Sequence, residues 1–367
     1  MFLQKLQIRI AASGIVAAAV FTATRATAET PPLGPTASRA LCSEQGPSHL
    51  DQPPSRPVLE RSFAQGPNRF LIYRTGHLVL LTPDGRGEKE VTVGREAVQG
   101  DARLSPDGKK VAMLIRSEAD GGEHQKLHVR TFDEEGTDTD LGVECKTLVS
   151  VAWSPDGAEI AFADMPEVWG QGFAHSIMDV KTREKKALKL PEGHLLTDWS
   201  RDGKLFLTTC YAADKENPQS RGARLYLVNR DGSEPRAMTD EKQVNAFGRL
   251  SPDGNRVLHG RMTPPKDGTG PAKRELMVLD VASGESTAVG DTQADGDILS
   301  CCWSPDGKRI AYAWRQFLFE AWYEGAPLKK TESRLVVCDP DGKNAGTVAS
   351  EQGTNPRAIT LGWVDWR

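Results

Sequence analysis

The stretch WSPDGAEIAFA, Trp153–Ala163, contains a tetrapeptide, Ser-Pro-Asp-Gly, that returns along the chain. It recurs in LSPDGKKVAML from Leu104, LSPDGNRVLHG from Leu250 and CWSPDGKRIAYA from Cys302, with a variant, DWSRDGKLFLT, from Asp198. Proline presets φ at the second position of a turn, aspartate tolerates the third, and glycine takes the left-handed conformation that lets a strand reverse. The motif is therefore interpreted as a hairpin turn, whose aspartate bonds local backbone rather than a metal ion.

The spacing of these turns indicates a repeated building unit. The turn serines, from Ser105 to Ser304, follow one another at intervals of 46 to 53 residues, close to the length of a four-stranded propeller blade. In each unit an apolar innermost strand such as LVSVAW precedes the turn and a second strand such as EIAFA follows it. A third strand, such as LYLVN at Leu225–Asn229, ends in another glycine turn. The sequence predicts an all-β fold of four-stranded antiparallel meanders.

The two ends of the repeat region predict how many blades there are. RFLIYR and the segment HLVLLTPDGRGEKEVTV, within Arg69–Val93, look like the second to fourth strands of a unit that lacks its innermost strand. AITLGW, Ala358–Trp363, aligns with ILSCCW, Ile298–Trp303, and would supply that strand and hide an open edge. Later blades should begin near Asp101, Ser150, Thr197, Phe247 and Ser300. We expect a six-bladed β-propeller over residues 69–367, its ring closed by the C-terminal strand.

The N-terminus has the pattern of an export signal. Lys5 and Arg9 precede an apolar run, Ile10–Phe21, and the triplet Ala26-Thr27-Ala28 fits a cleavage site. The run is shorter than the ~20 residues that a membrane span needs, although an uncleaved anchor is the alternative. We expect a signal peptide at residues 1–28, a Pro-rich tether at 29–68 with too few apolar residues to fold, and a periplasmic or secreted protein without a stable membrane span.

The net charge and the cysteine spacing exclude further classes of function. Removal of residues 1–28 takes away three basic residues and no acid, which changes the formal net charge from −4 to −7. An acidic exported protein has no electrostatic reason to bind nucleic acid. The six cysteines match no zinc-binding spacing. They are interpreted as buried free thiols, with disulfides as the alternative; Cys301 is expected to be a small core residue.

The recurring phrase W-S-P-D-G-K-x-I-A-Y at Trp303–Tyr312, with L-Y-L-V-N-x-D-G-S at Leu225–Ser233, resembles the WD40-like (Pro-Asp) repeat of the TolB-like β-propeller family. The resemblance covers about Arg69–Trp366. It implies a periplasmic, protein-binding role. TolB itself carries an α/β domain ahead of its propeller, where this chain has the Pro-rich tether.

Catalytic patterns are missing from the sequence. It contains no G-x-S-x-G, H-E-x-x-H, Walker or G-x-G-x-x-G motif. Four residues before the turn serines stand Asp101, Ser150, Leu196, Phe247 and Ser300, which form no ring of metal ligands. We expect a non-catalytic, monomeric binding module with no cofactor and no metal. The alternative is a propeller enzyme, a lactonase-like hydrolase or a lyase, with a metal in the central channel.

Long insertions are expected on the face opposite the turns, and this long-loop face is the predicted binding surface. The insertion Trp314–Ser333 concentrates aromatic residues, which dominate binding hot spots. The expected partner is an envelope or secreted protein, peptide or polymer. The alternative is that these aromatic residues belong to a half-buried strand extension, which would show the same alternation of Phe317 with Phe319. The candidate binding residues are Trp169, Tyr211, Phe317, Phe319, Trp322 and Tyr323.

Overall fold

The computed structural model describes residues 68–74, 77–86, 89–92, 97–116, 125–132, 137–145, 148–164, 172–213, 221–240, 244–263, 273–290, 296–317, 331–353 and 361–367. The regular structure in these ranges is β-strand. No helix in them is long and apolar enough to cross a membrane. The expected signal peptide and all of the expected tether except Asn68 lie outside the described residues.

The first three sheets are four-stranded and antiparallel. The first sheet combines the two ends of the described chain, because its order is β24-β1-β2-β3. The next two follow the chain, β4 to β7 and β8 to β11. Their bounds are β24 (Leu361–Trp366), β1 (Phe70–Arg74), β2 (His77–Leu81) and β3 (Lys89–Glu90); β4 (Ala97–Leu104), β5 (Lys110–Arg116), β6 (Gln125–Thr131) and β7 (Asp138–Cys145); and β8 (Leu148–Trp153), β9 (Glu159–Asp164), β10 (Ala174–Asp179) and β11 (Lys185–Leu188).

The remaining strands form three more four-stranded meanders, two of which share one sheet. A single parallel bridge, Ala223 to Val244, joins the fourth and fifth meanders. Their bounds are β12 (His194–Trp199), β13 (Leu205–Ala213), β14 (Arg221–Asn229) and β15 (Arg236–Ala237); β16 (Val244–Leu250), β17 (Arg256–Thr263), β18 (Lys273–Asp280) and β19 (Ser286–Ala288); and β20 (Gly296–Trp303), β21 (Ile310–Phe317), β22 (Thr331–Cys338) and β23 (Gly346–Gly353). The predicted four-stranded antiparallel units are therefore confirmed.

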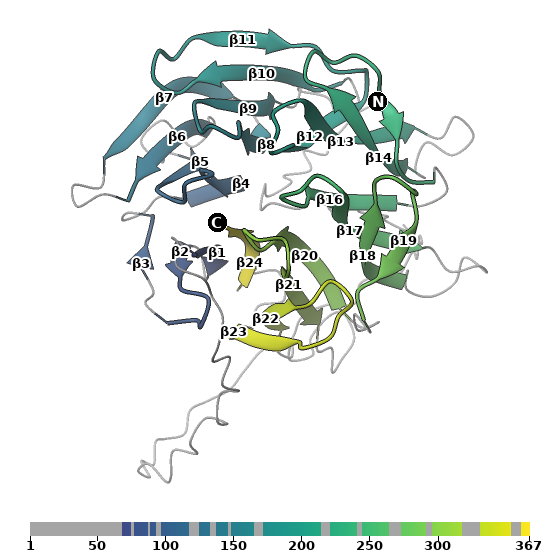
Figure 1. Cartoon of the computed structure of the whole chain (residues 1–367). Coiled ribbons are helices and arrows are strands. Elements are labelled where there is room, and N and C mark those ends of the chain that lie inside the picture. Colours follow the sequence, from purple (N-terminus) through teal and green to yellow (C-terminus); the bar gives the residue numbers. More distant parts are fainter. Residues whose placement is uncertain are drawn as a thin grey trace, which may run out of the picture.

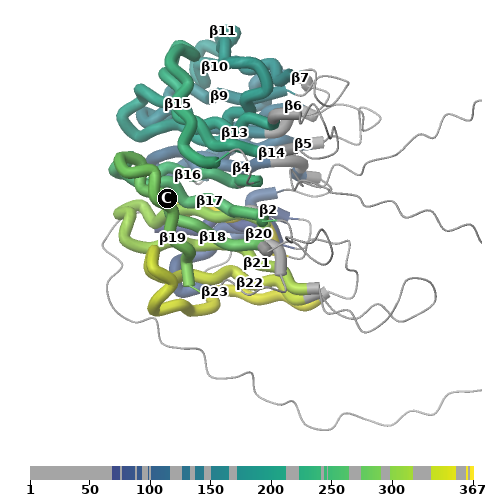
Figure 2. Tube along the Cα trace, turned by 90° about the vertical axis from the view of Figure 1, so that its right-hand side faces the viewer, coloured from purple at the N-terminus to yellow at the C-terminus, as the bar shows by residue number. Residues whose placement is uncertain are grey.

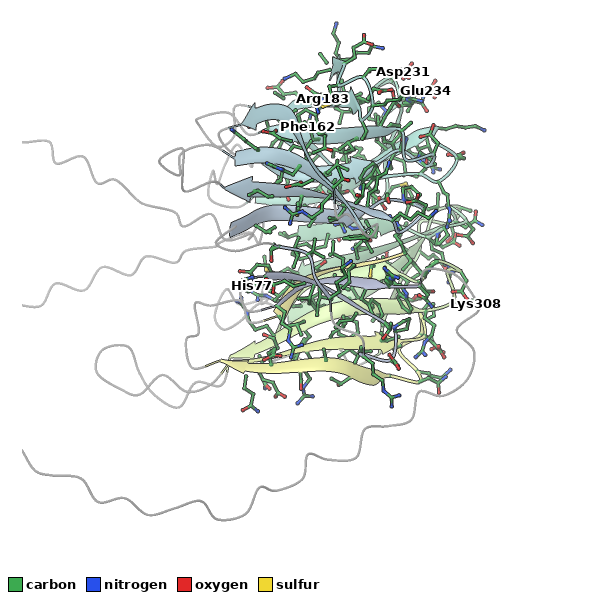
Figure 3. All side chains as sticks on the ribbon, turned by 90° about the vertical axis from the view of Figure 1, so that its left-hand side faces the viewer. His77, Phe162, Arg183, Asp231, Glu234 and Lys308 are labelled. Atoms are coloured by element: carbon green, nitrogen blue, oxygen red, sulfur yellow. The ribbon has the colours of Figure 1, made fainter. Side chains whose placement is uncertain are left out.

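The Ser-x-Asp-Gly turns have the predicted chemistry. In all five, the glycine N–H donates to the serine carbonyl at 2.8–2.9 Å, and the glycine φ lies between 66° and 75°. The serine hydroxyl donates to the aspartate at 2.5–2.7 Å. The same carboxylate accepts the N–H two residues further on at 3.0–3.1 Å. Each aspartate thus serves its own turn. We call the surface that carries these turns the turn face; Figure 3 labels Lys308 and Asp231 on that side of the molecule and His77 nearer the other.

The meanders surround a common centre (Figure 1). Their innermost strands contact one another in the order β24, β4, β8, β12, β16, β20 and again β24. Apolar side chains pack between neighbouring meanders in the same order. Between the last meander and the first, for example, Phe70 and Ile72 share a core with Ala311 and Leu335. Seen from the side, the C-terminus lies on one face, since β24 ends there (Figure 2).

The register of the C-terminal strand differs from the prediction. Trp366, not Trp363, occupies the place of Trp303, because Trp366 pairs with Phe70 at the start of its neighbour as Trp303 pairs with Ile310. Trp366 is fully buried against the Phe70 ring, with centroids 4.4 Å apart. The innermost strands also begin two to four residues before the expected positions, for example at Leu148 rather than Ser150. Each of these strands contains a register shift, which the alignment of simple strands did not include.

Candidate functional site

All six innermost strands reach one small cavity on the turn face. Its volume is about 80 Å³. Arg103, Asp198 and Arg249 stand two residues before their turns, and Asp365 occupies the same position in β24. Prolines of the turns also line the cavity. The lining residues are Arg103, Pro106, Trp153, Pro155, Asp198, Trp199, Arg201, Arg249, Leu250, Ser251, Pro252, Cys302, Trp303, Pro305, Asp365 and Arg367. We call this space the central cavity.

A bridge of charges crosses the centre at the cavity wall. Asp101 accepts hydrogen bonds from Arg103, at 3.0 Å from Nε and 2.8 Å from Nη2. The same carboxylate oxygen lies 3.6 Å from Nη2 of Arg249, which comes from β16, three meanders further round. The side chains of Asp101, Arg103 and Arg249 are only 14%, 6% and 12% exposed. One carboxylate therefore links two strands on opposite sides of the centre.

The other two carboxylates of the cavity are held by backbone amides of neighbouring strands. Asp365 accepts the Leu104 N–H at 2.9 Å, and Asp198 accepts the Leu250 N–H at 2.8 Å. The second oxygen of Asp198 accepts the N–H of Trp199 at 2.9 Å. Burial raises the pKa of Asp198 to about 6, although Arg367 and Arg103 oppose the rise. These bonds fix both carboxylates before any ligand arrives.

Tryptophans repeat the same connection between strands. Nε1 of Trp153 donates to the Arg103 carbonyl at 2.9 Å, and Nε1 of Trp303 donates to the Arg249 carbonyl at 3.0 Å. The Arg256 guanidinium lies over the Trp303 ring, 4.5 Å from its centroid, a cation–π geometry. The cavity wall is consequently rigid as well as charged.

The backbone next to Arg249 is strained. Phe247 has φ of 60°, a conformation that is unusual for a bulky residue, and it lies at the register shift of β16. The Phe247 carbonyl accepts a 3.4 Å hydrogen bond from Sγ of Cys301. Such outliers cluster at binding and catalytic sites, because the surrounding structure must hold them in place. The strain therefore supports this region as the candidate site.

A larger recess, of about 720 Å³, opens between the turns of the third and fourth meanders. Its aspartates, Asp156 and Asp202, bond their own turn serines at 2.6 and 2.7 Å. Arg230 pairs with Glu159 at 2.5 Å and stacks over Trp199, 5.1 Å from the ring centroid. The charged groups of this recess are already paired with one another. We therefore place the candidate site in the central cavity, which is smaller and whose charged side chains are more buried.

Most of the predicted binding residues cannot be placed. Trp169, Phe319, Trp322 and Tyr323 lie outside the described residues, and Phe317 ends β21 with its side chain undescribed. Tyr211 lies in β13, partly buried, with its ring centroid 6.3 Å from that of Phe173. Burial raises the pKa of its hydroxyl. The long-loop face thus stays a prediction.

The buried cysteines have the properties of core residues. Cys301 and Cys302 are 0% and 2% exposed, and burial raises the pKa of both thiols, to about 12 for Cys301. Among the described residues the free cysteines are Cys301, Cys302 and Cys338, which are buried as expected, and Cys210, which is only half-buried, so the expected burial was wrong there. A protonated, buried thiol is a poor nucleophile. The interpretation of Cys301 as a small core residue is confirmed.

Histidines and carboxylates do not gather into a metal site in the described part of the chain, where no group of three could hold an ion. His194 bonds Thr208 at 2.8 Å, whereas Asp198 bonds Leu250, so these two residues serve different partners. Burial lowers the pKa of His175 and of His259 to about 4. Both imidazoles are therefore neutral at physiological pH.

The charge cluster was not predicted from the sequence, because its residues lie two positions before the turns and not at the compared position four before them. The position four residues before each turn contributes Asp101 alone. Two residues before the turns stand Arg103, Ala152, Asp198, Arg249 and Cys302, and Asp365 occupies that position in β24. In β4, β12 and β16 a register shift falls at or between these two positions, and a shift changes the face to which the next residues point. The alternating charges in the second column are visible in the sequence.

Comparison with known structures identifies the fold. TolB from Acinetobacter baumannii is similar with a TM-score of 0.61 and 20% identity, over 82% of this chain and 66% of that one, just under two thirds of its length. A putative TolB from Agrobacterium tumefaciens gives 0.54 and 18%, over 77% and 88% of the chains. A chain of a nidogen/laminin complex gives 0.53 and 11%, over 81% and 97%.

No family model matches the chain, and no curated protein matches it. At these identities the structural likeness concerns the fold alone. The molecule has an all-β, TolB-like β-propeller fold of four-stranded antiparallel sheets.

Proposed function

We propose that this chain is an exported, non-catalytic binding module, built as a closed six-bladed propeller that uses the central cavity as its binding site. The closed ring is supported by two observations. The innermost strands contact one another in a cycle that returns to β24, and an apolar core lies between every neighbouring pair of meanders in that cycle. The C-terminal strand β24 pairs with β1 and so covers an edge of β1 that would otherwise be open.

The observation that carries the binding role is the convergence of all six innermost strands on the central cavity. Its arginines and aspartates are held by hydrogen bonds to backbone and to each other, before any ligand is present. Prolines and tryptophans surround these polar groups. Binding sites typically combine a concave apolar wall with a few fixed polar groups, because preorganisation lowers the entropic cost of binding.

Export and partner follow from the sequence and from the fold. The signal-like N-terminus supports a location in the periplasm or outside the cell. The TolB-like fold supports a role in the envelope, with a protein, peptide or polymer as the partner and a monomeric propeller on a Pro-rich tether. The long-loop face, with Trp169, Tyr211, Phe317, Phe319, Trp322 and Tyr323, is proposed as a second contact surface.

Affinity capture tests this function at the cavity rim. The mature chain, immobilised and exposed to an envelope extract of its own organism, should retain a defined partner. Arg201 is exposed on the rim, so Arg201→Glu should lose that partner without unfolding the protein. Lys308→Glu, an 82% exposed charge on an outer position of the same face, should retain it. Equal retention by both variants would exclude the central cavity as the site.

The alternative function is a propeller enzyme, and one observation favours it. Asp198 has a raised pKa of about 6 inside a cavity, which is a common property of catalytic carboxylates. Both of its oxygens, however, already accept backbone N–H groups. Metal analysis of the purified mature protein separates the two functions: a stoichiometric bound metal that requires Asp198 would support the enzyme.

A further inference from the structure

We propose that the central cavity binds a carboxylate group, an inference that rests on the proposed binding role and names the chemistry of the ligand. Candidate sources of this group are the C-terminus of a peptide and a small free carboxylate.

Arg249 has donor capacity that the protein does not use. Its Nη1 donates to the carbonyls of Thr197 and Gly248, both at 2.8 Å. Its Nη2 lies 3.6 Å from Asp101, beyond ordinary hydrogen-bond length. Its Nε is buried and has no acceptor among the described residues. A buried donor without an acceptor is costly, so an incoming oxygen would be favoured here.

Arg367 lines the same cavity and is even less engaged. Its Nη1 makes one long hydrogen bond, 3.4 Å, to the Trp366 carbonyl and lies 3.9 Å from Asp365. The other N–H groups of its guanidinium have no acceptor in the part of the chain that the structure describes. Its side chain is 35% exposed, so it can move toward a ligand at little cost.

The carboxylates of the cavity, by contrast, each have N–H partners already. Asp198 accepts two backbone N–H groups and Asp365 accepts one. One oxygen of Asp101 accepts the Nε and Nη2 groups of Arg103. Every carboxylate is thus held by at least one donor, whereas the buried Nε of Arg249 has no acceptor among the described residues. An anionic acceptor fits this imbalance, and arginine pairs with a planar carboxylate through two parallel hydrogen bonds.

The size of the cavity favours a small group. A volume of about 80 Å³ holds on the order of five to eight water molecules, at roughly 10–15 Å³ each. This is enough for a carboxylate and its neighbouring atoms, while a folded domain would stay outside on the proline rim. A chain end or a small acid is thus preferred over a bulky anion.

Titration of the mature protein with defined probes tests the inference. Trp153, Trp199 and Trp303 line the cavity, so tryptophan fluorescence reports its occupation. The probes are acetyl-tetraglycine with a free C-terminal carboxylate, the same peptide as its amide, and sodium acetate. We expect the free acid to bind and the amide not to bind. If acetate binds as well as the free-acid peptide, the site takes small carboxylates rather than chain ends.

Matched arginine variants complete the test. Arg367→Gln should weaken binding of the free-acid probe by about tenfold or more, the usual effect of losing a charge-assisted hydrogen bond. Arg86→Gln, at a 77% exposed arginine of an outer turn, should change nothing. The inference is overturned if no carboxylate probe binds, or if Arg367→Gln binds it like the wild type while melting at the same temperature. If the envelope partner is still captured in that case, only the carboxylate inference has failed. If neither the carboxylate probes nor an envelope partner bind, the proposed binding role is refuted as well.

Discussion

At the scale of single residues, buried charges distinguish the centre of this molecule from its turns. The turn aspartates are exposed, and hydrogen bonds from the turn serine hydroxyl and from backbone N–H groups hold their pKa values below the ordinary range, as in Asp156 and Asp202. Asp101 and Asp198 are mostly shielded from solvent, and this burial raises the pKa of both. Ion pairs at the surface contribute little to stability, whereas breaking a buried pair is costly. Substitutions of the central aspartates should therefore lower the free energy of unfolding more than substitutions of the turn aspartates.

Asp101→Asn should destabilise the protein by about 3–5 kcal/mol, because it leaves the buried Arg103 and Arg249 without their counter-ion. Asp341→Asn is the control, since Asp341 pairs with Lys343 at 2.7 Å with side chains 53% and 79% exposed. That variant should leave the free energy of unfolding almost unchanged, because an exposed ion pair contributes little to stability. Urea denaturation measures both. Similar losses in the two variants would contradict the buried bridge.

The neutral histidines predict a loss of stability in acid. The folded pKa of His175 and of His259 is about 4, below the ordinary 6.5, so the unfolded chain binds more protons below pH 6.5. Their contribution is complete above about pH 6.5 and falls as the pH drops toward 4. Each histidine should lower the free energy of unfolding by roughly 2 kcal/mol as the pH falls from 6.5 to 5.

Asp198 acts in the opposite direction, because its raised pKa makes the folded state take up a proton near pH 6. Comparison with a His259→Met variant isolates the histidine, since His259 is 1% exposed and its ring nitrogens have no partner in the described structure. We expect the variant to lose less stability than the wild type between pH 7.5 and 5. Parallel pH profiles would show that His259 does not titrate as described.

At the scale of strands and turns, local chemistry was predictable and register was not. Proline, aspartate and glycine in Ser-Pro-Asp-Gly act within a few residues, so the sequence alone predicted all five turns and the strands around them. The register shifts in the innermost strands depend on packing against neighbouring sheets, which no local pattern reports. For this reason Trp363 was aligned where Trp366 lies, and the charged column that includes Arg249 and Asp365 was overlooked.

Two glycines test the packing between sheets. Gly232 and Gly284 occupy equivalent turns, with φ of 87° and 75°. A Cβ on Gly232 would lie 1.8 Å from the Lys189 carbonyl oxygen of the preceding meander, whereas a Cβ on Gly284 would meet nothing within 4 Å. Gly284→Ala should cost about 1 kcal/mol from its backbone alone. Gly232→Ala should lower the free energy of unfolding by about 1–3 kcal/mol more, because of the added clash. Thermal unfolding measures both variants. Equal losses would mean that the two sheets do not touch there.

At the scale of the whole molecule, the centre is built from two similar halves. The residues directly before the turn positions read Trp366, Leu104, Trp153 and then Trp199, Leu250, Trp303. The preceding column reads Asp365, Arg103, Ala152 and then Asp198, Arg249, Cys302. The bonds repeat as well, from Asp365 and Asp198 to the next strand and from Trp153 and Trp303 to the previous one. This two-fold pattern supports a ring in which opposite strands are equivalent.

Deletion of Leu361–Arg367 tests the ring. It removes Leu361, Val364 and Trp366, which are at most 1% exposed, and each such side chain is worth ~1.5–3 kcal/mol. It also exposes the edge of β1. The truncated protein should melt at a lower temperature and self-associate in light scattering, whereas Arg367→Gln, which keeps the strand, should remain monomeric. An unchanged melting temperature and a monomeric truncated protein would rule out closure by the C-terminal strand.

Site-specific photo-cross-linking in living cells tests the central claim most directly. A photoreactive amino acid is placed at Arg201 on the cavity rim, at Lys343 on an exposed outer turn, or at Trp322 in the predicted long-loop insertion. We expect a discrete adduct with an envelope partner from position 201, a weaker adduct when Arg367→Gln is combined with it, and no adduct from position 343. Adducts from position 322 alone, with none from 201, would contradict the central cavity as the binding site.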